Sequence, residues 1–427
     1  MATAEVIKVA APELEKSVDL SGKLAESCFT VGWVLEALGK KDEKFKKFSE
    51  HSKVSRVSAV DISGGKGFVS KVYNISIEFE GMNESYSVIL KVPGMESMAD
   101  AMESIHDGEL IQLDQIAQVH NIECAFYDDF AAHIQIPLAK IYKTEDFIIG
   151  KQPGALLMES LFGKTASCPV WTSANSHQIY AIAGHVAHLN KYFLCLPSEQ
   201  WAGKLQSETY ASIAEKGYFI PFFAQCKEMK PGAFDEAVEL FSKFANSRDF
   251  FNYTLNGVIE DTGLPLSVSH GDLWANNILW KKNPDGSVSN EVAAIIDWQV
   301  FHEGCLTNDL ARFFAFCVDG DVRRDHEWKV LEFFYDTLVK LMKEEGRTVD
   351  FTLEQVKITY KVNFFCQTIM SMMIPSFLFP VKEWTPEEAS YKFAQREKVL
   401  LRCQLNAEDA LEYFKDFSTL SYFKNFA

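Results

Sequence analysis

The stretch VSHGDLWANNILW (Val268–Trp280) sets a His, an Asp and two Asn between apolar flanks. A second stretch, AAIIDWQVF (Ala293–Phe301), holds one Asp inside an apolar, strand-like run. Phosphoryl transfer requires a carboxylate that orients or deprotonates the acceptor hydroxyl, and oxygen ligands that hold Mg²⁺ on the phosphates. Asp272 suits the first role. Asn277 and Asp297 suit the second, so the two stretches predict a site for phosphate transfer.

Glycines upstream of these stretches suit the binding of phosphate. The segment SGGKGFVS holds Gly64, Gly65 and Gly67 between two predicted strands, with Ser70 closing the pattern. Glycine lets the backbone approach a ligand closely and exposes N–H groups to anions. No helix follows, so the dinucleotide-binding fold is a poor match. A plain glycine hairpin explains the segment equally well.

Two charged residues between the glycines and the loop could complete a nucleotide site. Lys91 ends the apolar run SYSVILKVP, where it could reach phosphates or simply snorkel to the surface. Glu123 lies on a predicted helix, where it could hold Lys91 in place or face solvent. His270 is expected to be structural, and turn chemistry alone could explain the whole set of loop residues, including Asp272, Asn277 and Asp297. All of these features occur in one order along the chain: the glycine segment, Lys91, Glu123, the loop with Asp272 and then Asp297. This complete order favours a phosphate-transfer site over the simpler explanation of each feature.

The elements that position these residues change along the chain. Residues 71–80 alternate apolar and polar side chains, as a half-buried strand does, and belong to an antiparallel three-strand unit. After about residue 162 helical spacing dominates. We therefore predict an α+β fold with a sheet-rich N-lobe (1–160) and a helical C-lobe (161–427). Helices are predicted at 30–48, 105–131, 174–194, 207–225, 322–345, 352–373 and 386–416, and a further strand pair at 136–144 and 146–161.

Composition excludes some partners. The formal net charge is −17, and no basic stripe is present, so nucleic acid and anionic membrane surfaces are not expected partners. The apolar segment Phe364–Pro380 is short, holds polar residues and predicts a buried helix end. The nine Cys are scattered and form no CxxC motif, and the N-terminus does not resemble a signal peptide. We expect a cytoplasmic protein, and no feature indicates an oligomeric state.

Two further groups of residues have a simpler explanation. His185 and His188 share a predicted helix face at zinc-binding spacing, but no third ligand is evident, so packed histidines are favoured. Met370, Met372 and Met373 could line an adaptable apolar pocket, although core packing is favoured. If the methionines and aromatic residues of the helical lobe line the acceptor pocket, the acceptor would be lipophilic, such as a sterol or an apolar glucoside.

The motifs together resemble a known superfamily. HGDLWANNILW and IIDWQ resemble the catalytic loop and metal-binding Asp of protein-kinase-like enzymes, in the branch of aminoglycoside phosphotransferases and choline kinases. With GGKGFVSKV, HNIECAFY and AIIDWQVFHEGCLTNDLARFF, the chain more narrowly resembles the ecdysteroid kinase-like (CHK kinase-like) family, especially its nematode group. The resemblance implies a two-lobed fold with a small antiparallel-sheet N-lobe and a large, mostly helical C-lobe. It also implies ATP and Mg²⁺ as cofactors.

The resemblance assigns nucleotide contacts to the N-lobe. Lys91 would contact the α- and β-phosphates and pair with Glu123. The segment LLMESL would connect the lobes, with backbone near Glu159 to Leu161 reading adenine. Gly64, Gly65, Gly67 and Ser70 would cover the phosphates.

In the C-lobe the same resemblance assigns the chemistry. Asp272 would be the catalytic base, and Asn277 and Asp297 would bind Mg²⁺. Asp309, in NDLARFF, would brace the loop from a following helix, a role compatible with a helix N-cap.

One departure from protein kinases narrows the substrate. No APE motif follows Asp297, and only 12 positions separate it from Asp309, which leaves little room for a peptide platform. The leading hypothesis is therefore a kinase that phosphorylates a small-molecule hydroxyl. The alternative is a non-catalytic pseudokinase that binds a lipophilic ligand or a protein partner. This alternative is disfavoured because the expected functional residues are all intact: Lys91, Asp272, Asn277 and Asp297.

Overall fold

The computed structural model describes residues 18–63, 69–94, 112–206, 208–380 and 384–426. Its contacts divide the chain into two units. The first contains the described residues before His106, together with 141–145 and 155–160, and the second contains the rest. The predicted phosphate-contacting glycines Gly64, Gly65 and Gly67 lie outside the described residues.

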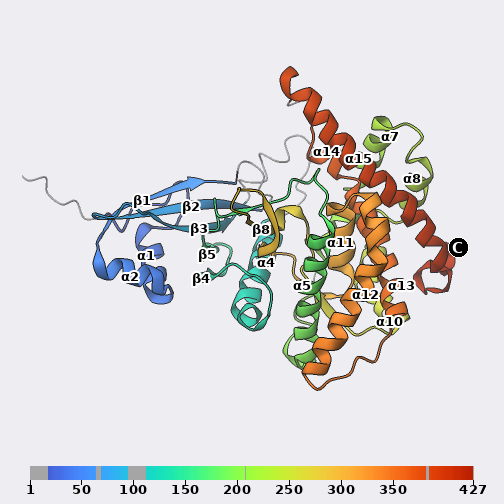
Figure 1. The fold of residues 1–427 in the computed structure, drawn as a ribbon, viewed down its shortest axis with the longest axis horizontal. Helices are drawn as coiled ribbons and strands as arrows, with labels where there is room; N and C mark the ends of the chain where they lie inside the picture. Colours follow the sequence, from blue (N-terminus) through green and yellow to red (C-terminus); the bar gives the residue numbers. More distant parts are fainter. Residues whose placement is uncertain (1–17, 64–68, 95–111, 207, 381–383, 427) are drawn as a thin grey trace, which may run out of the picture. The chain divides into compact units, whose positions relative to one another are not determined.

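The first unit is an antiparallel sheet with two helices (Figure 1). Its five strands follow the order β1-β2-β3-β5-β4, and every neighbouring pair is antiparallel. The elements are α1 (Val31–Lys41), α2 (Glu43–His51), β1 (Val54–Asp61), β2 (Ser70–Phe79), β3 (Tyr86–Pro93), β4 (Ile141–Glu145) and β5 (Ala155–Glu159).

Strand β2 shows why this sheet forms. Tyr73, Ile75, Ile77 and Phe79 are buried while the residues between them are half-buried, which confirms the predicted alternation. These side chains join a core that includes Val34 of α1. Because successive side chains of a strand point to opposite faces, one face of β2 is apolar and packs in this core.

The single helix predicted over residues 30–48 is wrong, because the chain breaks at Asp42. This residue is extended (φ −111°, ψ 105°), and its carboxylate accepts the backbone N–H of Lys44 at 3.1 Å. Asp42 therefore ends α1 and caps the N-terminus of α2, a preferred role for aspartate. The strand predicted over 136–144 is also shorter than expected, because only Ile141–Glu145 pairs with β5.

The second unit is mostly helical. In Figure 1, helices α5, α11, α12 and α13 run side by side, with α15 along their edge. Its helices are α4 (Leu113–Ala125), α5 (Ser176–Cys195), α6 (Thr209–Glu215), α7 (Ile220–Met229), α8 (Asp235–Phe241), α9 (Arg248–Asn252), α10 (Val258–Thr262), α11 (Asn308–Cys317), α12 (Gly320–Glu344), α13 (Leu353–Ser371), α14 (Ile374–Phe377) and α15 (Pro386–Phe414). An antiparallel-sheet unit and a helical unit confirm the predicted α+β fold class.

Two predicted helices of this unit have different bounds. The helix predicted over 207–225 is divided into α6 and α7, because Gly217 between them is left-handed at φ +78°. Within the predicted range 105–131, α4 ends at Ala125 and continues as a π-helical turn, Phe126–Phe130, while 105–111 lies outside the described residues. The contacts assign α4 to the second unit.

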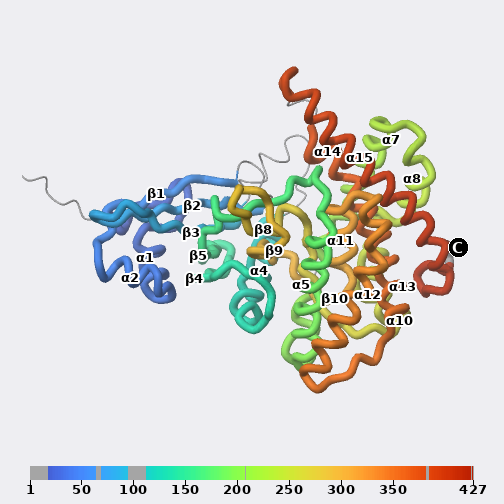
Figure 2. Tube along the Cα trace, viewed as in Figure 1, coloured from blue at the N-terminus to red at the C-terminus, as the bar shows by residue number. Residues whose placement is uncertain are grey.

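Short strands in the helical unit carry the chemical motifs. β7 (Ser267–Ser269) pairs with β10 (His302–Gly304), and β8 (Ile278–Lys282) lies between β6 (Thr165–Ala166) and β9 (Val288–Ile295). Figure 2 follows the chain from β8 through β9 and β10 to α11. The loop at 270–277 runs from β7 to β8, and Asp297 lies between β9 and β10. The strand pairings therefore bring two stretches separated in sequence to one place.

Phenylalanine fills the core of this unit. The ring of Phe365 lies 5.2 to 5.6 Å from the rings of Phe241, Phe244 and Phe414. The apolar segment from Phe364 to Pro380 forms the buried end of α13 and the short α14, as predicted. Among the described residues, no helix is both long and apolar enough to cross a bilayer.

Candidate active site

The loop after β7 reverses direction at Gly271. This residue has φ +83°, and a Cβ added to it would meet the carbonyl oxygen of Val300 and lie 2.8 Å from Nδ1 of His302. Glycine alone satisfies both the backbone conformation and the close approach to β10. The turn at Gly271 therefore fixes the position of the Asp272 backbone.

Replacing Gly271 with Ala should lower both stability and activity. A non-glycine residue in this conformation costs about 1–3 kcal/mol, and the contact with Val300 forces the loop to shift. Gly286, in the turn between β8 and β9, is the matched control, because it has φ +85° and nothing within 4 Å of an added Cβ. Denaturant unfolding should show a larger loss for Gly271→Ala than for Gly286→Ala. Equal losses would contradict the close packing inferred here.

His270 joins the two motif stretches. Its Nδ1 accepts the backbone N–H of Asp272 at 3.2 Å, and its Nε2 lies 3.0 Å from the carbonyl oxygen of Ile296. These partners assign the neutral tautomer with the proton on Nε2. The imidazole is buried and its ring centroid lies 4.5 Å from that of Trp298. His270 therefore braces the loop against the Asp297 stretch and does not face solvent.

Asp309, at the start of α11, holds the same loop from the other side. Its carboxylate accepts the backbone N–H groups of His270 and Gly271 at 2.7 and 3.0 Å. Burial raises the pKa of Asp309, while the hydrogen bonds from the backbone N–H groups of Gly271 and His270 oppose the rise. The predicted bracing contact is confirmed, and it satisfies two backbone donors that would otherwise be buried without partners.

Asp272 and Asn277 lie against each other. The Asn277 side-chain N–H₂ donates to the Asp272 backbone carbonyl at 2.8 Å and to its Oδ2 at 3.0 Å. The turn Ala275–Asn277 closes the five-residue spacing. Because the amide nitrogen donates to Asp272, the Asn277 side-chain oxygen points in a different direction within the same amide plane. Asn277 could therefore offer its side-chain oxygen to a metal ion.

Asp297 reaches the loop through the main chain. The N–H of Ile296 donates to the carbonyl oxygen of Asn277 at 2.9 Å, next to the pairing of Ile278 with Ile295. Asp297 itself is left-handed, with φ +69°, which aspartate tolerates better than most residues. A strained backbone at a carboxylate beside the loop is typical of functional sites.

Glu123 is buried rather than solvated. It is 1% exposed on α4, and its carboxylate accepts the backbone N–H of Trp298 at 3.2 Å. The Trp298 ring stacks on Phe126, with centroids 3.8 Å apart and planes within 5°. Helix α4 therefore holds the residue after Asp297 in place. The predicted pairing of Glu123 with Lys91 stays a prediction.

The remaining predicted nucleotide contacts lie at the sheet. Lys91 is on β3 opposite Val72 and is 8% exposed, so it is not a snorkelling surface residue. Ser70, also buried, begins β2, and Glu159 ends β5. Leu161, by contrast, belongs to the second unit, and its carbonyl oxygen accepts the N–H groups of the turn that follows it.

Two residues that the sequence analysis did not select contact Asp272. The Arg312 guanidinium on α11 forms an ion pair with Asp272 Oδ1. The Tyr210 hydroxyl on α6 donates to the Gly271 carbonyl at 3.2 Å and lies 3.5 Å from the same Oδ1. The available signal was a lone arginine in the apolar helix NDLARFFAFC. No comparable signal marks Tyr210.

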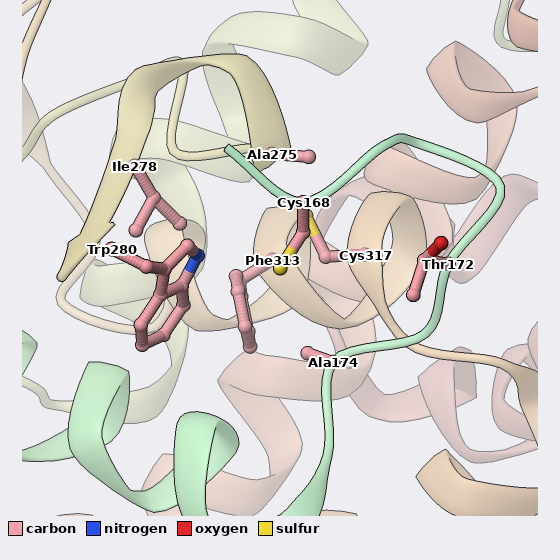
Figure 3. Close-up of a pocket in the computed structure, with 8 residues that line it drawn as sticks. All are labelled: Cys168, Thr172, Ala174, Ala275, Ile278, Trp280, Phe313 and Cys317. Carbon is pink, nitrogen blue, oxygen red and sulfur yellow. The ribbon is translucent and has the colours of Figure 1, made fainter. Parts of the chain in front are cut away.

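Two small cavities adjoin the loop, and each measures about 10 Å³. Figure 3 shows the first, which is lined by Cys168, Thr172, Ala174, Ala275, Ile278, Trp280, Phe313 and Cys317. The second borders His270 and Asp309. A volume of this size holds about one water molecule, so neither cavity can hold an acceptor or a nucleotide.

The weaker candidates are half-buried or core residues: His185, His188 and Met373 are half-buried, and Met370 and Met372 are buried. Burial lowers the pKa of His185 to about 4, so this side chain is neutral at physiological pH. Within the described chain, no cluster of three His, Cys, Asp or Glu side chains is placed to hold a metal ion, and His185 and His188 belong to none. Met370 and Met372 are buried in the core, and Met370 Sδ lies 3.9 Å from the Arg312 guanidinium.

The antiparallel-sheet unit and the mostly helical unit define a chain of the α+β fold class. The chain belongs to the DUF1679 family, whose profile, described as "Uncharacterized oxidoreductase dhs-27", matches residues 29–417.

Two relatives from Caenorhabditis elegans match most of the chain. "Uncharacterized oxidoreductase dhs-27" is 25% identical over 366 residues, which is 83% of this chain and 42% of the relative. "Uncharacterized kinase-like protein D1044.1" is 22% identical over 331 residues, which is 74% of this chain and 82% of the relative. The chain therefore spans less than half the length of the first relative.

Solved structures of small-molecule kinases are also similar. Choline kinase from Cryptosporidium parvum has a TM-score of 0.48 at 11% identity, covering 90% of this chain and 95% of that one. A putative aminoglycoside phosphotransferase from Ralstonia eutropha has a TM-score of 0.42 at 12% identity, covering 88% and 98%.

Proposed function

We propose that this protein is an ATP- and Mg²⁺-dependent kinase of a small-molecule hydroxyl, of the ecdysteroid kinase-like (CHK kinase-like) type. The observation that carries the proposal is the loop in which Asn277 is hydrogen-bonded to Asp272 and paired through the backbone with the residue before Asp297. A base and two oxygen ligands in one place are what phosphate transfer to an alcohol requires.

The residues at this place fit Mg²⁺. Asn277 and Asp297 supply hard oxygen donors, and Mg²⁺ is bound in such sites through one or two protein ligands, substrate phosphates and water. When bound, Mg²⁺ would neutralise charge on the transferring phosphate. Asn277 and Asp297 would hold it, while Asp272 would orient the acceptor hydroxyl and take its proton. Lys91 and Ser70 of the sheet unit, with main chain near Glu159, would contact the nucleotide.

The acceptor is proposed to be a small molecule rather than a protein. Residues 300–310 are all buried, and His302–Gly304 is paired with β7. The segment after Asp297 therefore offers no exposed platform for a peptide. Aromatic side chains gather at Asp272, where Tyr210 lies within reach and the Trp274 ring packs edge-on against Phe316 at 6.3 Å. This environment supports a lipophilic alcohol, steroid- or glucoside-like.

The oxidoreductase name of one relative suggests a different activity. A dinucleotide-binding oxidoreductase fold needs a parallel sheet with a glycine-rich turn opening a helix. The five-stranded sheet described here is antiparallel throughout. Since the chain spans only 42% of that relative, the name does not transfer to this chain. A cytoplasmic location, with all nine cysteines free, is part of the proposal.

The proposal is tested by transfer of labelled phosphate from Mg·ATP to a panel of alcohols. We expect label in a sterol or an apolar glucoside. If label appears only in choline or sugars, the proposal of a lipophilic acceptor is overturned, while the proposal of kinase activity is supported. Label in generic protein substrates would indicate a protein kinase. If the protein shows no phosphate transfer and no Mg·ATP hydrolysis, the result would favour the non-catalytic, ligand-binding alternative.

A further inference from the structure

Arg312 is a buried cation in helix α11, and every other side chain of this helix after Asp309 is apolar. Its side chain is 7% exposed, and its guanidinium carbon lies 4.2 Å from the ring centre of Phe316 and 5.4 Å from that of Tyr210. A buried ion pair contributes little to stability by itself, because desolvation offsets the attraction between the charges. Its location beside Asp272 therefore calls for a role other than holding helices together.

The guanidinium is fixed on two sides. One terminal nitrogen donates to Gln367 Oε1 of α13 at 3.0 Å and lies 3.9 Å from Met370 Sδ. The other donates to Asp272 Oδ1. The planar fork of arginine makes these contacts in different directions at once, which a lysine ammonium on its flexible stem does not reproduce. Helix α13 thus determines where the carboxylate of Asp272 is held.

The contacts leave one part of Asp272 for the acceptor. Oδ1 receives Arg312 and lies near the Tyr210 hydroxyl, and Oδ2 receives one N–H of Asn277. An ionised carboxylate has about four lone-pair positions, two on each oxygen. The second lone pair of Oδ2 is therefore the place for the proton of an acceptor hydroxyl.

We propose that Arg312 is a positioning residue, which holds the Asp272 carboxylate so that Oδ2 faces the acceptor hydroxyl. The inference rests on the proposed kinase function and extends it to a residue outside the recognised motifs. Arg312 acts through Asp272 and does not itself touch the reacting atoms.

The matched control is Arg323 on α12. It is as buried as Arg312, its guanidinium carbon lies 4.6 Å from the Phe364 ring, and its charged partners are Glu327 and Asp409, neither of which belongs to the loop. Exchanging each arginine for lysine therefore compares two similar buried ion pairs, of which only one involves Asp272.

The test measures kcat and KM for Mg·ATP hydrolysis, with water as the acceptor, and the melting temperature of each variant. Small displacements of a catalytic group cost about 10²-fold, so kcat should fall by about that factor in Arg312→Met and less in Arg312→Lys, with an unchanged KM. Arg323→Lys should lower the melting temperature and keep kcat. In an Asp272→Asn background, Arg312→Lys should cause no further loss.

Three results would overturn the inference. The first is that Arg312→Lys and Arg312→Met both keep the wild-type kcat. The second is that Arg323→Lys lowers kcat as much as Arg312→Lys does. The third is that Arg312→Lys lowers kcat by its full factor again when it is added to Asp272→Asn. A wild type that neither hydrolyses Mg·ATP nor is stabilised by it overturns the kinase function itself, and the role of Arg312 with it. If the wild type hydrolyses Mg·ATP and the Arg312 variants keep its kcat, only the positioning role of Arg312 is overturned.

Discussion

Replacing Asp272 with Asn should leave the fold intact and reduce phosphate transfer by about 10²–10⁴-fold. The amide has the shape of the carboxylate, so an oxygen can still accept from Arg312. It lacks the negative charge and the basicity that would take the proton of the acceptor. The measurement is kcat for transfer from Mg·ATP, with the melting temperature as a check on folding.

The matched control for this change is Asp285→Asn, in the turn between β8 and β9. There the carboxylate accepts only local hydrogen bonds, from the backbone and side chain of Ser287. It should keep the wild-type kcat. Near-normal turnover in Asp272→Asn would refute the assignment of the base, whereas equal losses in both variants would point to a general effect of removing a carboxylate.

The contacts within the loop were predictable because its geometry is local. Asp272 and Asn277 are five residues apart, and a single tight turn brings them into hydrogen-bonding distance. The position of Asp297 follows from one short hairpin, since Ile278 pairs with Ile295. Residue type and spacing determine such contacts almost completely, so a sequence pattern is enough to propose them.

Arg312 could not be predicted in the same way. Its partners Asp272, Gln367 and Met370 lie 40, 55 and 58 residues away in the chain. Their contact depends on how α11 packs against α13 and on which face of α11 turns to the loop. The arginine is visible in the sequence as a charge among apolar residues, but the pattern does not identify the carboxylate that neutralises it.

The helix boundaries that were missed had local causes. Asp42 followed by Glu43 is a start signal for a helix, and the apolar spacing on both sides concealed it. Gly217 likewise marks a break between α6 and α7. Hydrophobic periodicity indicates which face is buried, but a capping side chain or a left-handed glycine decides where the helix ends.

Asp297→Gly should abolish the stabilisation that Mg·ATP gives to the wild type. A ligand at a concentration 100-fold above its Kd stabilises the folded state by about 2.7 kcal/mol. Asp297 is a proposed Mg²⁺ ligand, so its removal should leave the melting temperature insensitive to the nucleotide and metal together. Glycine is chosen because the backbone at this position has φ +69°, which alanine adopts only with strain.

The two replacements at this position separate binding from folding. Asp297→Ala should lower the melting temperature of the ligand-free protein relative to Asp297→Gly, because only glycine accepts the left-handed backbone freely. Both should fail to respond to Mg·ATP, while the wild type should require ATP and Mg²⁺ together. If Mg·ATP raises the melting temperature of Asp297→Gly as much as that of the wild type, Asp297 is not a ligand of the metal. A wild type that does not respond at millimolar Mg·ATP would instead favour a non-catalytic binding protein, because a kinase must bind its nucleotide before it can transfer phosphate.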